Sequence, residues 1–185
     1  MAAEYLTLLT ALLAAALGGG IALLTTFLTN RANTARLQLE HSHEAKRRKS
    51  ELLRERGEEL YELTDKWLKI LAGHYIGRSI VMQGKMTYDQ FIEGAVKIGK
   101  EHNVNFGRIQ MLIDVYFPAV RPQYDAVLAG RTELNRVDSA HLRAHENGDA
   151  EAEKLLGPYV VAQQVIEVSG ELLKKKIIEC IQAID

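Results

Sequence analysis

Two histidines of this chain stand at a spacing that suits metal chemistry. His141 and His145 lie four residues apart, with Asp138 and Glu146 close by. On a helix, residues four apart share one face, so both imidazoles can approach one ion. A structural or catalytic zinc site needs three or four converging ligands, and the zinc-protease motif needs a glutamate where Leu142 stands. We therefore predict no metal site and no cofactor, and we interpret this segment as a polar helix face.

A second pattern, Arg136-Val-Asp-Ser-Ala-His141, resembles the Arg-x4-6-His pair of the HEPN superfamily, whose all-helical members often dimerise and in many cases cleave RNA. The resemblance implies that Arg136 and His141 would be the catalytic residues of a HEPN-like ribonuclease. On a continuous helix these two side chains point about 140° apart. Arg36-x4-His41 has the same spacing. We therefore expect no enzyme, and we keep a membrane-tethered HEPN-like ribonuclease or HEPN-like accessory protein as the alternative.

Other chemistry-bearing patterns are missing from the sequence. We find no phosphate-binding glycine loop, no Ser or Cys nucleophile in a familiar context, and no alternation of aromatic and basic residues. Nucleic acid is therefore not an expected partner. The single cysteine, Cys180, excludes an internal disulfide, and its apolar neighbours predict a buried thiol.

The elements that would position these side chains begin with an uncharged stretch, Tyr5 to Asn30, which reads YLTLLTALLAAALGGGIALLTTFLTN. As a helix it would span about 39 Å, against about 30 Å of bilayer hydrocarbon. No Lys or Arg precedes it, whereas a cleaved signal peptide begins with a basic region. We therefore predict a single transmembrane helix, with residues 1–30 as the anchor, and we keep a signal peptide cleaved near Ala14 to Ala16 as the alternative.

Basic residues follow this stretch and predict its orientation, because positive charge gathers on the cytoplasmic side of a membrane helix. The predicted location is the cell (inner) membrane, single-pass, with a short N-terminus outside and the C-terminal domain in the cytoplasm. These side chains would lie near lipid headgroups, or on a solvated helix face if the helix continues straight. The membrane-proximal basic residues are Arg31, Arg36, Lys46, Arg47, Arg48 and Lys49.

One face of the predicted anchor carries only small or hydroxylated residues. Small residues let two backbones approach closely, and threonines can hydrogen-bond across such a contact. We interpret this stripe as a self-association face, and a ring of copies with threonines lining a pore is a sharper version of the same hypothesis. The residues of the stripe are Thr7, Ala11, Ala14, Gly18, Ala22, Thr25 and Thr29.

The rest of the chain predicts helices, so the fold class is all-α. The N-terminal helix is expected to continue into residues 31–52, a basic juxtamembrane helical stalk with few large apolar side chains, so that residues 31–82 form one long helix or two nearly collinear ones. From residue 53 to Met82 a heptad pattern appears, which would pack on another copy or on later helices of the chain. Residues 53–185 are expected to form a cytoplasmic bundle of four or five helices. The heptad residues are Leu53, Leu60, Leu63, Trp67 and Ile70.

Local signals place the later helices. A capping box at residues 87–90 predicts a helix to about Glu101. Further helices are expected over 108–117 and 122–145. A last one is expected from about 150 to 184, interrupted at Gly157-Pro158, with Tyr159, Ile166, Leu173, Ile177, Cys180 and Ile184 on one face.

Together these patterns predict a non-enzymatic, self-associating membrane protein that acts through protein–protein contact. Two roles fit: a scaffold or docking subunit for an unidentified cytoplasmic protein, and a membrane-perturbing, pore-type effector of the kind found in bacterial anti-phage defence. The expected partners are membrane lipid, further copies of the chain and that cytoplasmic protein.

Overall fold

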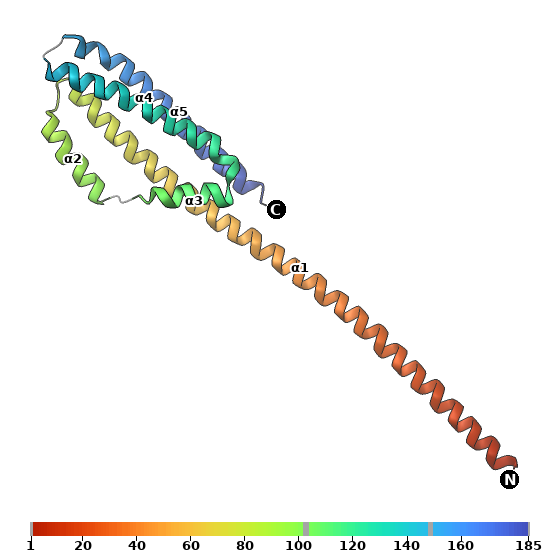
Figure 1. The fold of residues 1–185 in the computed structure, drawn as a ribbon. Coiled ribbons are helices and arrows are strands. Elements are labelled where there is room, and N and C mark those ends of the chain that lie inside the picture. The colour runs from red at the N-terminus through yellow and green to blue at the C-terminus, as the bar shows by residue number, and fades with distance from the viewer. Residues whose placement is uncertain (1, 102–103, 148–149, 185) are drawn as a thin grey trace. The chain divides into compact units, whose positions relative to one another are not determined.

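A computed structural model of the chain describes residues 2–101, 104–147 and 150–184, and for some helical residues within these ranges only the backbone. The described residues are helical almost throughout and contain no strand, so the predicted all-α fold is confirmed (Figure 1). The elements in chain order are α1 (Ala2–Met82), α2 (Tyr88–Glu101), α3 (Phe106–Tyr116), the 3-10 helix η1 (Pro118–Val120), α4 (Arg121–Glu146), the 3-10 helix η2 (Ala150–Leu155) and α5 (Leu156–Gln182).

The chain divides into two units, Met1–Lys49 and Ser50–Asp185. The first unit is the N-terminal part of α1, and its described side chains between 25 and 49 are exposed. Ion pairs one helical turn apart support it, such as Arg36 Nε with Glu40 Oε1 at 2.8 Å. The second unit is a bundle, in which the remainder of α1 packs with the later helices.

The predicted transmembrane anchor is wrong. In the part of the chain that the structure describes, no helix is long and apolar enough to cross a membrane. The uncharged run at residues 5–30 is not a separate element, because the same helix continues through residues 31–49, whose described side chains are mostly polar or charged. The predicted location, a single-pass protein of the inner membrane with its N-terminus outside, is therefore also wrong.

The core of the bundle forms along one seam of α1. Leu60, Thr64, Trp67, Tyr75 and Met82 are buried there and follow the three- and four-residue steps of a packed helix. Of the predicted heptad, Leu60 and Trp67 are buried, while Leu63 and Ile70 pack against the core from its edge. The partners of this seam are the later helices of the same chain: Trp67 lies 5.5 Å from the Tyr124 ring of α4, and Tyr159 of α5 donates a hydrogen bond to the Tyr75 carbonyl.

A glycine ends α1 and lets the chain reverse. Gly84 has a φ of 68°, a left-handed backbone conformation that residues other than glycine rarely adopt. Its N–H donates to the Val81 carbonyl and the next N–H, that of Lys85, donates to the Ile80 carbonyl, which together form a Schellman cap. The turn places residues 85–88 beside the end of α1, where they border a pocket described below.

Two caps start the next helices. The predicted capping box is confirmed, because the Gln90 N–H donates to Thr87 Oγ1 at 3.3 Å and the Thr87 N–H donates to Gln90 Oε1 at 3.1 Å. The third helix begins at Phe106, two residues before the predicted start. The reason is Asn105, whose side-chain oxygen accepts the N–H of Arg108 and so supplies the N-cap.

Candidate interaction surface

An exposed apolar stripe runs along α5. Its four members are spaced at intervals of four, three and four residues, and each is at least 50% exposed. This is the spacing of alternating d and a positions in a helix–helix seam. We call it the α5 stripe, and it consists of Val161, Val165, Val168 and Leu172.

Packing on the opposite face fixes the stripe in its outward orientation. Tyr159, Ile166, Leu173 and Ile177 are buried, which confirms most of the predicted inward face of this helix. Two close approaches prevent the helix from rotating. A Cβ added at Gly130 of α4 would lie 2.9 Å from Ile166 Cγ1, and one added at Gly170 would lie 3.0 Å from a methyl group of Leu68. α5 cannot turn its exposed valines inward without losing these contacts.

Opposite charges flank the stripe. With Val165 and Leu172 as a positions, Glu171 occupies a g position and Lys176 occupies the e position of the next heptad. Each is already paired along its own helix, Glu171 with Lys174 Nζ at 2.8 Å and Lys176 with Glu179 at 3.2 Å. Both remain within reach of a neighbouring helix laid along the stripe, because the Glu171 side chain is 70% exposed and that of Lys176 33%.

The predicted self-association face lies on the N-terminal unit. The side chains of Thr7, Ala11, Ala14, Gly18 and Ala22 fall outside the described residues. Thr25 and Thr29 are exposed on α1. This face stays a prediction.

The predicted basic residues also lie on α1, and all six are exposed. Arg36 pairs with Glu40, and Arg48 pairs with Glu44 at 3.5 Å, so part of their charge is balanced along the helix. Their exposure is what a solvated helix face, the second of the two expectations for this segment, requires, and that expectation stays a prediction. Contact of these residues with lipid headgroups stays a prediction.

The HEPN-like pair is not brought together within one chain. Both residues lie on the continuous helix α4. Arg136 is exposed, and its guanidinium makes two hydrogen bonds to the Glu133 carboxylate at 2.7 and 2.9 Å. His141 is buried on the side of α4 that faces the bundle. The two side chains therefore do not share one surface.

The predicted polar helix face does not hold at His141, which is buried and contacts His145. The rings of His141 and His145 are stacked, with centroids 6.1 Å apart and planes 6° from parallel. Among the described residues, no group of three or more His, Cys, Asp or Glu side chains converges as metal ligands would. His141 instead lines a pocket with Arg78, a residue that the sequence did not single out.

Comparison with known proteins finds no match: no family model, no curated protein and no solved structure is similar to this chain.

Proposed function

We propose that this chain acts through protein–protein contact, as a self-associating helical subunit in which the α5 stripe of one copy packs on the α5 stripe of a second copy. The observation that carries the proposal is the stripe itself, four large apolar side chains at helix-seam spacing that are exposed on the bundle surface. Contiguous exposed apolar patches mark interaction surfaces. The role that follows is that of a scaffold or docking subunit.

A second copy is the occupant that fits the stripe. A twofold interface requires the same patch on both subunits, and a stripe of d and a positions is complementary to itself. If the two helices run parallel, the g residue Glu171 of one copy faces the e residue Lys176 of the other. The symmetry repeats this pair on both sides of the seam, so two opposite-charge pairs support a parallel arrangement.

The expected strength of this contact is modest. Full burial of a Val or Leu side chain contributes about 1.5–3 kcal/mol. The side chains of the stripe are already about half covered, so eight of them, four from each copy, contribute on the order of 8 kcal/mol. The loss of translational and rotational freedom costs about 4–15 kcal/mol. We therefore expect a weak dimer that forms in a concentration-dependent way.

The test is the mass of the full chain in solution, measured by sedimentation equilibrium over a range of concentrations. The variant Val165→Glu/Val168→Glu places charges in the centre of the seam and should shift the chain to monomer. Val115→Glu is the matched control, because Val115 is 63% exposed on another helix, α3, and is not part of the stripe. A chain that is monomeric at all concentrations, or a dimer that the stripe variant leaves intact, would refute the proposal.

Charge reversal tests the parallel arrangement separately. Glu171→Lys alone places two lysines opposite each other, and Lys176→Glu alone places two glutamates opposite each other, so each should weaken the dimer. The double reversal restores opposite charges and should recover the dimer constant of the natural chain. Two single variants without effect would contradict the parallel register while leaving the stripe itself in place.

A further inference from the structure

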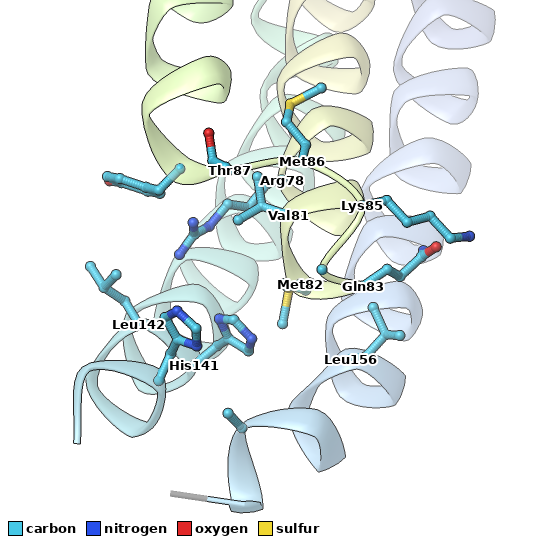
Figure 2. A pocket seen from close by; sticks show the side chains of 14 residues that line it. Arg78, Val81, Met82, Gln83, Lys85, Met86, Thr87, His141, Leu142 and Leu156 are labelled. Carbon is cyan, nitrogen blue, oxygen red and sulfur yellow. The ribbon is translucent and has the colours of Figure 1, made fainter. Parts of the chain in front are cut away.

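A pocket lies at the end of the bundle where α1, α2, α4 and α5 meet. Its volume of about 940 Å³ falls at the upper end of the range of small-molecule sites. Much of its wall is apolar, from the ends of three helices and the turn after α1. The apolar lining includes Val81, Met82, Met86, Leu142 and Leu156 (Figure 2).

A buried arginine with an incomplete set of partners lines this pocket. Arg78 is only 2% exposed, and its Nε donates to Asp138 Oδ1. Its guanidinium lies over the Tyr88 ring, 4.9 Å from the centroid. The Nη2 group has no hydrogen-bond partner in the described structure. Because an unpaired buried N–H of a charged group is costly, this atom is suited to an acceptor that enters the pocket.

His141 supplies a second unpaired nitrogen at the same place. The residue is 6% exposed, and its Nδ1 has no hydrogen-bond partner among the described residues. Burial, together with the nearby charges of Arg78 and His145, lowers the pKa of His141, so the ring is neutral near pH 7. Figure 2 shows the guanidinium of Arg78 pointing toward His141, whereas Lys85 extends away from both. With its proton on Nδ1, the ring is a second donor for a ligand of the pocket that both residues line.

The free donors of the site select the ligand. They are the Nη2 group of Arg78, whose charge is already paired with Asp138, and the ring N–H of the neutral His141. A phosphate dianion would bring two charges and three acceptor oxygens, more than these donors match. A carboxylate brings one charge and two acceptor oxygens, and the apolar wall suits a hydrocarbon or aromatic body attached to it.

We propose that this pocket binds a small organic carboxylate, whose oxygens accept hydrogen bonds from Arg78 Nη2 and from His141, and whose apolar body packs on Met82, Met86 and Leu156. The site is independent of the α5 stripe, because no stripe residue lines it. The ligand would lock the turn after α1 against the end of α4, since residues of both form the pocket wall.

Isothermal titration calorimetry of the full chain tests carboxylate binding with three probes that have the same number of carbon atoms: octanoate, octanol and octyl phosphate. Octanoate should bind one site per chain, at least tenfold more tightly than the alcohol, because a charged acceptor strengthens the bonds to Arg78. It should also bind more tightly than octyl phosphate, which brings a second charge and a third acceptor oxygen that these two donors do not match. Equal affinity for the acid and the alcohol, no saturable binding of octanoate, or tighter binding of the phosphate would each overturn the proposal.

Variants separate binding from folding. Arg78→Met/Asp138→Leu removes both members of the ion pair and leaves no buried charge, so the bundle should stay folded. It should lose the preference for octanoate over octanol. Arg136→Met makes the same change at an exposed arginine and should bind octanoate as the natural chain does. Met86→Glu keeps Arg78 and places a charge in the apolar wall, so it should weaken octanoate binding at least tenfold. Undiminished preference for octanoate in the double variant would refute the role of Arg78.

Discussion

The ion pair between Arg78 and Asp138 predicts two substitutions of unequal cost. The Arg78 side chain is 3% exposed, whereas that of Asp138 is 31% exposed. Asp138→Leu leaves a buried guanidinium without its counter-ion, and breaking a buried pair in this way costs about 3–5 kcal/mol of unfolding free energy. Arg78→Met leaves a carboxylate that water still reaches, so the loss should be about 1–3 kcal/mol, mainly from the charged hydrogen bond and the contact with Tyr88.

The double variant completes the cycle. Arg78→Met/Asp138→Leu leaves no unpaired charge and should therefore cost less than Asp138→Leu alone. The free energies are measured by urea unfolding followed by circular dichroism, with the slope of each curve compared to detect changes in the unfolded state. The exposed pair Arg136 and Glu133 is the matched control, and Arg136→Met there should produce no measurable change. If Asp138→Leu cost no more than Arg78→Met, the asymmetry of burial would not control the energy of this pair.

Three further predictions concern a turn, a titration and the sequence-derived sites. Gly84→Ala should lower the free energy of unfolding by about 1 kcal/mol, because the left-handed φ of this residue penalises any Cβ. Gly94→Ala within α2 should raise the free energy of unfolding by about 0.5–1 kcal/mol, because a Cβ there meets open space. Urea unfolding of both variants tests these opposite signs. His141→Gln should flatten the pH dependence of stability. Since the pKa of His141 is lowered, the unfolded chain takes up a proton below about pH 6.5 that the folded chain does not, and the unfolding free energy of the natural chain falls as the pH falls through that range. Arg136→Ala should leave the dimer constant unchanged, and an RNA-cleaving activity that this variant lost would make the HEPN-like pair functional.

Local signals in the sequence predicted much of the secondary structure. The Thr87 and Gln90 capping box and the helix after it occur as expected, because a cap depends on residues three apart and needs no distant partner. The start of the third helix was predicted two residues late. Its signal, Asn105 as an N-cap, was present in the sequence, but the contact of Phe106 with Trp67, at 6.1 Å between ring centroids, could not be read locally.

The N-terminal prediction failed in one part only. Length and hydropathy of residues 5–30 suggested a membrane span, and no helix of the described residues is long and apolar enough to be one. The expected continuation into a long helical stalk does occur, because α1 runs on past Asn30 to Met82. Helix ends are set by caps and breakers, and the first strong one in this chain is Gly84.

The pocket was missed because its chemistry depends on pairing across the bundle. Arg78 lies on the buried seam of α1 between Tyr75 and Met82, but it falls outside the a and d positions that continue the predicted heptad, so the pattern did not mark it. Its partner Asp138 lies 60 residues further along the chain, and no local pattern connects the two. His141 was noticed for its spacing to His145, yet its place beside Arg78 follows only from how α4 packs on α1.

The α5 stripe illustrates why a surface is harder to predict than a core. Residues 159–173 are apolar on two faces of the helix, and the sequence contains the buried set and the exposed set at the same helical spacing. Choosing Tyr159, Ile166 and Leu173 as the inward face was correct, and it left three valines and Leu172 on the other side without a role. A bundle needs one apolar face per helix, so a second face on α5 is surplus to its folding. That surplus is the physical reason to expect a further helix against it, and the charges at Glu171 and Lys176 favour a second copy of α5 as that helix.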